Sequence, residues 1–394
     1  MKYILIVGDG MGDYPIPEYE NKTPLEIAKI PYLDFLASHG EMGLVKTIPS
    51  RMPKGSDVAN LSILGYNPKK YYIGRGFLEA TNMGIKIDDK QSVFRCNLIT
   101  VKNDILFDYS AGHISNKESH KLIKTLNEYL STNKVKFFSG VSYRHILTLF
   151  EDYSNLICRP PHDIINQPFK KFLPKGKNSD FIINLINESK KILENHPVNI
   201  LRKKENLNLA NMIWPWGQGK NKNAPTFKEK YGLNGSVVSA VDLIKGIGKW
   251  IGLDVITVSG ATGYLDTNYA GKVKSALKSL EKKDFVFIHI EAPDEASHSG
   301  ELELKLKAIE DFDKKVILPM LEGLKKFQEY KIMVLPDHYT PLCLRTHSDD
   351  PVPWVIYSSK KEKNTKLVFN EKLAKKSGIY FKQGYKLIKY FLEK

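Results

Sequence analysis

Short apolar stretches that alternate with helical segments constrain the fold of this chain more than any other feature. Between residues 232 and 394, the apolar stretch Asp284–Ile290 precedes a helical pattern over Leu302–Leu321, and Ile332–Leu335 follows. Such stretches are bounded by Gly, Pro or Asp, which is typical of buried strands joined by helices. The pattern predicts βαβ units and therefore an α/β fold with a mostly parallel sheet flanked by helices. The other segments expected in this part are Ser236–Val241, Asp242–Ile251, Asp254–Val258, Asn268–Leu280 and Trp354–Tyr357.

The two ends of the chain resemble each other, whereas the middle differs. Residues 1–80 begin with the strand Tyr3–Val7 and continue through a helical segment near Thr23–Gly40. Residues 81–220 have the pattern of a smaller α+β domain. Its expected strands and helices are Val93–Val101, Ile105–Tyr109, Asn116–Leu130, Lys136–Ser139, Tyr143–Phe150 and Ser179–Asn195. We predict one domain from residues 1–80 and 221–394, with residues 81–220 inserted into it. Trp214–Lys220 is interpreted as a hinge or a packed turn, and Gln383–Lys394 as a closing amphipathic helix.

Composition excludes several classes of protein. With 42% hydrophobic and 26% charged residues, the chain has the composition of a globular protein, and no apolar run reaches the roughly 18–20 residues that span a bilayer. The net charge of +15 comes from lysines spread along the sequence, which indicates solvated faces more than a nucleic-acid surface. The three cysteines are far apart and in no metal-binding spacing, so a reducing cytoplasm is the expected compartment.

Clusters of Asp and His follow several of the expected strands. Asp294 and His298 are four residues apart after one strand, Asp337-His338 follow another, and Asp9 follows the first. His347 lies in a polar loop farther on. Taken singly, each cluster is more typical of helix caps and surface loops. Because carboxyl ends of parallel strands meet at one sheet edge, we expect these Asp and His side chains to converge there as ligands of two divalent cations.

A serine lies where such cations would activate it. Ser56 stands between Gly55 and Asp57, before a run, Val58–Leu64, that can form a helix. A helix N-terminus accepts phosphate, and a serine hydroxyl needs a base or a metal to act as a nucleophile. Taken alone, Ser56 would be an ordinary helix cap. With the metal ligands it indicates phosphoryl transfer. The glycines around Asp9 lack the Lys-Ser/Thr of a nucleotide-binding P-loop and are interpreted as room for Asp9 to reach a metal.

The middle segment contains side chains that can bind anions. These candidates are Arg75, Arg95, His113, Arg144, Arg159 and His162. Single arginines are mostly surface ion pairs, so residue type alone does not distinguish these candidates from ordinary surface charges.

The metal-ligand motifs together resemble those of a known family, the cofactor-independent phosphoglycerate mutases of the archaeal type, which belong to the alkaline phosphatase-like metalloenzyme superfamily. The resemblance covers nearly the whole chain, including the insertion. The motifs that carry it are Asp9-Gly10-Met11-Gly12, Gly55-Ser56-Asp57, Ile63-Leu64-Gly65-Tyr66, Gly74-Arg75-Gly76, Pro293 to His298, Asp337-His338 and His347.

The resemblance implies a division of labour among these residues. One ion would be held by Asp294, His298 and His347, and the other by Asp9, Ser56, Asp337 and His338. Ser56 would take the phosphoryl group from phosphoglycerate, while the inserted cap domain binds substrate and excludes water. The ions would be Mn²⁺ foremost, with Zn²⁺, Co²⁺ or Mg²⁺ as alternatives, and no 2,3-bisphosphoglycerate would be needed. Arg75, Arg95, Arg144 and Lys228 or Lys230 are the anion clamps expected from their chemistry.

Two alternatives stay open at this point. Val58-Ala59-Asn60 and His113 depart from the archaeal pattern and resemble a bacterial branch for which homoserine phosphorylation has been proposed, so a homoserine kinase-like phosphotransferase is the first. A non-catalytic basic protein that binds nucleic acid is the second. The prediction is a phosphoglycerate mutase acting on a small phosphorylated acid, with neither membrane nor nucleic acid as partner. The sequence does not specify an oligomeric state.

Overall fold

In the computed structural model, which describes residues 1–393, the chain divides into two compact units. Residues 1–72 and the chain from residue 224 onward form one, which we call the core unit, and residues 73–223 form the inserted unit. The first boundary thus lies at 72/73 instead of 80/81, and the second at 223/224 instead of 220/221. The first differs because the helix Arg75–Asn82 packs within the inserted unit, where Gly76 lies against the backbone of Arg95.

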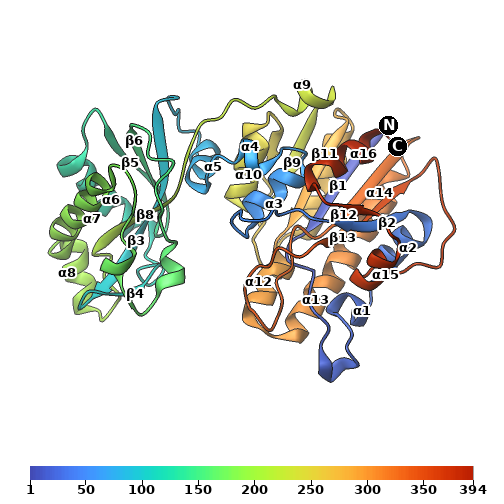
Figure 1. The fold of residues 1–394 in the computed structure, drawn as a ribbon, viewed down its shortest axis with the longest axis horizontal. Helices are drawn as coiled ribbons and strands as arrows, with labels where there is room; N and C mark the ends of the chain where they lie inside the picture. Colours follow the sequence, from blue (N-terminus) through green and yellow to red (C-terminus); the bar gives the residue numbers. More distant parts are fainter. Residues whose placement is uncertain (394) are drawn as a thin grey trace. The chain divides into compact units, whose positions relative to one another are not determined.

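The core unit is built on an eight-stranded sheet of the order β10-β9-β11-β1-β12-β13-β2-β14 within the described residues. Figure 1 shows β9, β11, β1, β12, β13 and β2 of this sheet with helices of the core unit beside them. Every neighbouring pair is parallel except the two that β13 makes with β12 and β2. The predicted α/β class with a mostly parallel sheet is therefore confirmed. The strands are β1 (Lys2–Gly8), β2 (Glu41–Val45), β9 (Gly235–Val238), β10 (Asp254–Ile256), β11 (Phe285–Ile290), β12 (Tyr330–Leu335), β13 (Val352–Ser358) and β14 (Tyr380–Phe381).

The central strands are buried on both faces, as expected for a parallel sheet covered by helices. Every residue of β11 and β12 is buried. Alternate side chains point to opposite faces. Ile4, Val286 and Ile332 share one hydrophobic cluster with residues of the surrounding helices. The helices of the core unit are α1 (Pro24–Ile27), α2 (Pro31–His39), α3 (Ser56–Ile63), α4 (Pro68–Tyr71), α9 (Phe227–Tyr231), α10 (Asp242–Trp250), α11 (Tyr269–Leu280), α12 (Ala292–Ser299), α13 (Leu302–Phe312), α14 (Leu318–Leu324), α15 (Glu371–Lys376) and α16 (Leu387–Glu393).

Two expected helices are interrupted. The segment near Thr23–Gly40 forms α1 and α2 separately, because Pro31 begins a new helix and disfavours helical backbone at the preceding residue. Leu302–Leu321 contains a π-helical turn at Asp313–Ile317 between α13 and α14. The closing helix is shorter than expected, since α16 begins only at Leu387, and its last predicted residue, Lys394, lies outside the described residues. α16 lies beside β1 (Figure 1), where the rings of Tyr3 and Phe391 are 5.7 Å apart.

The inserted unit contains an antiparallel sheet of the order β5-β6-β3-β4-β7, to which β8 adds by pairing with β3. Its strands are β3 (Gln91–Lys102), β4 (Ile105–Asp108), β5 (Val135–Val141), β6 (Arg144–Phe150), β7 (Gln167–Pro168) and β8 (Met212–Lys220). Its helices are α5 (Arg75–Asn82), α6 (Asn116–Leu130), α7 (Ser179–Glu194) and α8 (Pro197–Lys204). Leu122 and Ile186 of these helices join Leu98 and Leu147 of the sheet in a separate hydrophobic core.

The interpretation of Trp214–Lys220 as a hinge or turn is wrong. This segment lies in β8 and pairs with β3, with Trp214 opposite Asn97 and Pro215 opposite Cys96. A proline in a strand is tolerated where the strand pairs on one side only, as β8 does within the described residues. Among residues 1–393, none of the helices combines the length and the apolar character that crossing a bilayer requires.

Candidate metal centre and active site

The predicted metal ligands lie in segments that follow three neighbouring strands. β1 is flanked by β11 and β12, and all three run parallel, so their carboxyl ends share one edge of the sheet. Asp9 directly follows β1, Asp294 and His298 lie in α12 after β11, and Asp337 and His338 follow β12. The structure brings all five together at this edge.

Asp294, His298 and His347 form the first cluster. Nε2 of His298 lies 3.1 Å from Asp294 Oδ2, and Nε2 of His347 lies 3.4 Å from Asp294 Oδ1. The two Nε2 atoms are 3.2 Å apart. Three N and O atoms this close, all from side chains that ligate transition metals, fit a single divalent cation.

The other ring nitrogens of these histidines are held by the backbone. His298 Nδ1 lies 3.0 Å from the carbonyl oxygen of Arg345, and His347 Nδ1 lies 3.2 Å from that of Lys54. Carbonyl oxygens only accept, so each Nδ1 donates. Each Nε2 hydrogen-bonds Asp294 while it is protonated, and would offer a lone pair to a cation on losing that proton. This arrangement is usual for metal-binding histidines, whose second nitrogen fixes the ring.

Asp9, Ser56, Asp337 and His338 form the second cluster. Nε2 of His338 is 3.1 Å from Ser56 Oγ, 3.4 Å from Asp9 Oδ1 and 3.6 Å from Asp337 Oδ2. Ser56 Oγ is also 3.5 Å from Asp9 Oδ2. The other three side chains that the resemblance assigns to the second ion therefore all lie near His338 Nε2.

The carboxylates at this edge repel one another and are removed from water. Burial, and then the neighbouring Asp337 and Asp294, raise the pKa of Asp9 well above its usual range. Although burial also opposes ionisation of Asp294, its hydrogen bonds with His298 and His347 hold its pKa well below the ordinary value. Asp9 Oδ1 is buried and has no hydrogen-bond partner in the part of the chain that the structure describes. Divalent cations would neutralise these carboxylates and would be coordinated by Asp9 Oδ1. The residues therefore fit the ions that the sequence predicts.

The glycine after Asp9 is required by the crowding of this edge. Gly10 has φ +65°, a left-handed conformation that favours glycine, and a Cβ there would lie 2.6 Å from both Asp294 Oδ1 and Thr340 Oγ1. Its N–H donates to Asp337 Oδ1 over 3.2 Å. The glycine thus allows the loop of Asp9 to approach both clusters.

Ser56 is the first residue of α3. The free N–H groups and the positive end of the helix dipole therefore lie at its hydroxyl, as an anion-binding site requires. Asp57, its neighbour, is directed elsewhere and accepts a hydrogen bond of 2.8 Å from the Tyr72 hydroxyl. The position combines a nucleophilic oxygen, metal ligands and a helix N-terminus.

Three further residues of the site were not predicted. Asn60, one turn after Ser56 in α3, donates to Asp337 Oδ2 over 2.8 Å. Thr340 donates its hydroxyl to Asp294 Oδ1 over 2.5 Å. His289 lies with Nε2 3.2 Å from Asp9 Oδ2. Only spacing from known ligands could have indicated Asn60 and Thr340, while His289 is concealed within an apolar strand.

Three of the predicted anion binders surround one carboxylate in the inserted unit. Arg75 Nε lies 3.0 Å and Arg95 Nη1 2.8 Å from Glu79 Oε1. Burial opposes ionisation of Glu79, but Arg95, Arg75 and Arg144 together lower its pKa. The guanidinium groups of Arg75 and Arg95 lie 5.5 and 5.0 Å from the ring centre of Trp216. Three arginines against one glutamate leave net positive charge, which suits an anion.

The structure separates the two predicted clamps Arg75 and Arg95 by exposure. Arg95 is only 5% exposed, and it also donates to Asn97 Oδ1 over 3.2 Å. Burial lowers its pKa to about 10, which leaves it charged at neutral pH. Arg75 and Arg144 are partly exposed. Arg95 therefore supports the cluster from within, and Arg75 and Arg144 are the members that a ligand can reach.

The remaining candidates divide into those near this cluster and those away from it. His162 packs edge-on against Trp216 with ring centres 5.4 Å apart, and His113 lies 5.8 Å from the ring of Tyr143. Arg159 is exposed, and its carbonyl accepts from Trp214 Nε1. Lys228 and Lys230 lie in α9 of the core unit, not in the inserted unit. Lys230 donates to the carbonyl of Gly65 and lies over the ring of Tyr66, which gives it a packing role.

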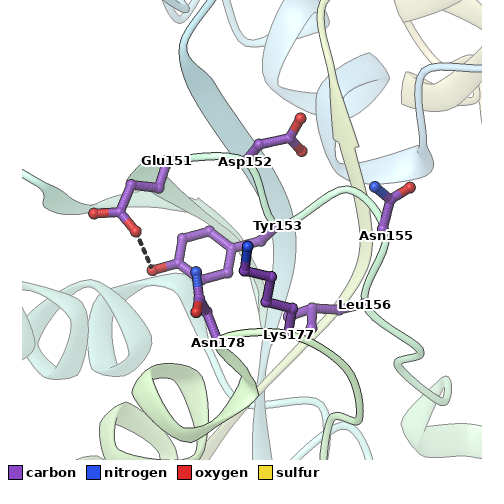
Figure 2. A pocket seen from close by; sticks show the side chains of 7 residues that line it. All are labelled: Glu151, Asp152, Tyr153, Asn155, Leu156, Lys177 and Asn178. Atoms are coloured by element: carbon purple, nitrogen blue, oxygen red, sulfur yellow. Dashed lines mark hydrogen bonds between the residues drawn. The ribbon is translucent and has the colours of Figure 1, made fainter.

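The inserted unit also contains a cavity of about 320 Å³ (Figure 2). Glu151 accepts a 3.3 Å hydrogen bond there from the Tyr153 hydroxyl. No predicted anion binder lines it, and two carboxylates against one lysine make it unsuited to an acidic substrate. It is lined by Glu151, Asp152, Tyr153, Asn155, Leu156, Lys177 and Asn178.

Comparison with known proteins gives a consistent result. Residues 37–199 match the family model described as 2,3-bisphosphoglycerate-independent phosphoglycerate mutase. The chain is 49% identical over 382 residues to the protein of that name from Methanosarcina mazei, covering 96% of each. It is 46% identical to a probable mutase of the same name from Geobacter sulfurreducens, with full coverage of both.

Solved structures give the same picture. A Pyrococcus horikoshii protein matches with a TM-score of 0.83 and 31% identity, over 100% of this chain and 96% of that one. The cofactor-independent phosphoglycerate mutase from Thermoplasma acidophilum matches with a TM-score of 0.64 and 28% identity, over 100% and 99%. The similarity extends over both the core unit and the inserted unit.

Proposed function

Because this chain belongs to the family of 2,3-bisphosphoglycerate-independent phosphoglycerate mutases, we propose that it interconverts 2-phosphoglycerate and 3-phosphoglycerate through a phosphoserine at Ser56. The reaction is an isomerisation by phosphoryl transfer and uses no 2,3-bisphosphoglycerate. The observation that carries the proposal is the position of Ser56, with its Oγ 3.1 Å from His338 Nε2 and 3.5 Å from Asp9 Oδ2 at the start of α3.

Two divalent cations belong to this proposal. Asp294, His298 and His347 would hold one, and Asp9, Ser56, Asp337 and His338 the other. When bound, such ions stabilise a serine alkoxide and neutralise phosphoryl oxygens. Mn²⁺ is the expected ion, with Zn²⁺, Co²⁺ and Mg²⁺ as alternatives, because nitrogen and oxygen ligands accept all of them.

The reaction proceeds in two balanced transfers. Ser56 Oγ forms a bond to phosphorus as the bond from phosphorus to the glycerate oxygen breaks, and the glycerate hydroxyl gains the proton that Ser56 loses. The second transfer returns the phosphoryl group to the other hydroxyl of glycerate and restores the Ser56 hydroxyl. The amide groups and positive dipole end of α3 stabilise the phosphoryl charge on Ser56 throughout.

The inserted unit supplies the positive charge for the carboxylate of the substrate. Arg75 and Arg144 are its partly exposed members, and Glu79 holds Arg75 through its Nε. A mutase differs from a phosphatase in retaining glycerate and excluding water from the phosphoserine, and we assign that retention to the inserted unit. In the cell this activity belongs to glycolysis and gluconeogenesis in the cytoplasm.

An assay combined with elemental analysis tests the proposal. The purified protein, loaded with Mn²⁺ and free of 2,3-bisphosphoglycerate, is expected to convert each phosphoglycerate into the other and to contain two ions per chain. Acid quenching during turnover should trap phosphate on the peptide that contains Ser56, which mass spectrometry detects.

Parallel reactions separate this proposal from its rivals. Transfer of phosphate from ATP to homoserine, without phosphoglycerate conversion, would identify a homoserine kinase-like phosphotransferase of the same fold. Release of inorganic phosphate as the main product would identify a phosphatase. Neither outcome is expected.

A further inference from the structure

His289 is the sole polar residue of β11, whose sequence is Phe-Val-Phe-Ile-His-Ile. Its side chain is fully buried. It pairs in register with Val7 of β1, two residues before Asp9. A histidine at the centre of a parallel sheet, near the edge where the metal ligands gather, requires a physical reason.

The surroundings of His289 consist of metal ligands. Its Nε2 lies 3.2 Å from Asp9 Oδ2. One ligand atom each from Asp9, His289 and Asp337 lie within 4.8 Å of one another. Two ligands on opposite sides of one ion are about 4.2 Å apart, given metal–ligand distances of about 2.1 Å. The three atoms are therefore close enough to bind the same cation after a small adjustment.

The hydrogen bonds of His289 are unsatisfied in a way that a cation would remedy. Among the described residues, neither of its ring nitrogens has a hydrogen-bond partner, although both are buried, and Asp9 Oδ1 beside it also has none. The approach of Nε2 to Asp9 does not have the alignment of a hydrogen bond. Orphaned polar atoms from adjoining side chains indicate a missing common partner rather than two separate defects.

His145, another buried histidine, has the surroundings expected of a residue with a packing role. His145, in β6 of the inserted unit, also has an unpartnered Nε2, but its Nδ1 accepts a 3.0 Å hydrogen bond from the Gly140 N–H. Within residues 1–393, it belongs to none of the groups that could hold a metal. His289 differs by having both nitrogens open and two carboxylates beside it.

We propose that His289 is a metal ligand, giving its Nε2 to the cation that Asp9 and Asp337 hold. The second ion would then have five protein ligands: Asp9, Ser56, Asp337, His338 and His289. Five donors suit an ion of high coordination number, such as Mn²⁺, better than a tetrahedral zinc site. This inference rests on the proposed two-ion site and adds a ligand that the family resemblance does not assign.

A direct test counts the histidines that bind metal in the wild-type chain. The protein, labelled with ¹⁵N-histidine and loaded with ¹¹³Cd²⁺, is examined by NMR for scalar coupling between cadmium and ring nitrogens. Of the ten histidines in the chain, four are expected to show coupling: His289, His298, His338 and His347. Coupling of three, with His289 among the uncoupled, would overturn this inference alone. Absence of bound cadmium, together with absence of bound Mn²⁺, would overturn the proposed ion site as well.

A variant measures the contribution of His289 to affinity. His289→Gln is expected to bind one Mn²⁺ as the wild type does and the second about 10–100-fold more weakly, by titration calorimetry. His145→Gln is the matched control, a buried histidine replaced in the same way, and should bind both ions normally. Thermal unfolding of the metal-free proteins establishes that His289→Gln is folded. Unchanged Mn²⁺ binding by a folded His289→Gln would contradict the inference.

Discussion

The core unit and the inserted unit each contain a cluster of like charges, which is buried in the core unit and partly exposed in the inserted unit, and the two clusters are balanced differently. In the core unit, Asp9, Asp294 and Asp337 meet at one sheet edge, and the residue that is least compensated, Asp9, has its pKa raised by burial and by the other two carboxylates. In the inserted unit, Arg75 and Arg95 share a carboxylate of the same chain, Glu79. One cluster therefore depends on ions from solution, whereas the other is largely completed by the protein itself.

Because of this difference, ion binding should affect the stability and reactivity of the core unit but not the stability of the inserted unit. A cluster that the protein completes is present whatever the solution contains, and suits a binding site that must exist before its ligand arrives. A cluster that needs cations gains its stability and its reactivity together when they bind. Removing one side chain or the ions should therefore have distinct effects on each unit.

The largest effect is expected at Ser56, which sets the core cluster apart as a reactive site. Ser56→Ala removes the proposed nucleophile and should reduce kcat by about 10⁴–10⁶-fold, the range seen when a catalytic nucleophile is lost. A coupled assay in both directions measures it. Ser62→Ala is the control, since Ser62 lies in the same helix with a buried hydroxyl that has no partner. Substantial mutase activity in a folded Ser56→Ala protein would refute the role of Ser56.

The next largest effect is expected when an arginine that compensates Glu79 in the inserted unit is removed. Arg95→Met leaves Glu79 with one partner fewer in a buried site and should lower the free energy of unfolding by about 3–5 kcal/mol. Urea unfolding measures it. The double variant Arg95→Met with Glu79→Gln should recover much of this loss, because the uncompensated carboxylate is gone. Lys134→Met, which removes the exposed pair with Glu151, is the control and should leave the free energy of unfolding nearly unchanged.

These clusters also differ in how far the sequence predicts them. Asp9, Asp294 and Asp337 are recognisable because each polar residue interrupts an apolar pattern at a strand end, and the parallel order then brings them together. His289 has no such signal, since a single histidine in an apolar strand is compatible with ordinary packing. The arginines of the inserted unit are found by residue type alone, and their shared partner Glu79 is not predicted, because no motif in the sequence links it to them.

The segment Trp214–Lys220 shows that some elements of the fold also cannot be predicted from local sequence. Its Trp, Pro and Gly residues favour a turn by local propensity, yet it forms β8. Pairing with β3, more than one hundred residues away in sequence, overrides that preference, with Trp216 opposite Arg95. Local patterns therefore predict the parallel core more reliably than the antiparallel inserted sheet, whose strand partners are set by tertiary contacts.

Metal removal should distinguish the two units in a single experiment. Chelation is expected to abolish mutase activity and to destabilise the core unit, while the inserted unit is unaffected. One ion at a free concentration 100 times its Kd stabilises by about 2.7 kcal/mol, which corresponds to a Tm shift of about 5–10 °C for a unit of this size. Calorimetry with chelator and with added Mn²⁺ measures the two transitions. Equal shifts in both units would show that the ions do not belong to the core cluster alone.

The smallest effect is a difference between the two units in how their stability depends on pH, in the metal-free protein. Glu371 of α15 accepts hydrogen bonds from the Thr23 hydroxyl and the Asp13 N–H, and burial raises its pKa to about 7. Its contribution to stability is complete below the pKa of about 4.3 of an unfolded glutamate. As pH rises toward 7 only the unfolded state loses the proton, so core-unit stability falls by at most about 1.4 kcal/mol per pH unit.

The buried His145 of the inserted unit should show the opposite pH dependence and therefore serves as the comparison. Burial lowers the pKa of His145 to about 3, so its contribution is present above pH 6.5 and is lost as pH falls toward 3. Calorimetry at pH 5.5 and 6.5 measures both effects. In the wild type, the Glu371 contribution makes core-unit stability fall as pH rises, and this fall should be absent in Glu371→Gln. The His145 contribution makes the stability of the inserted unit rise with pH, and this rise should be absent in His145→Gln. A Glu371→Gln protein that keeps the wild-type slope would mean that another carboxyl group of the core unit, such as a ligand of the metal-free cluster, carries the titration.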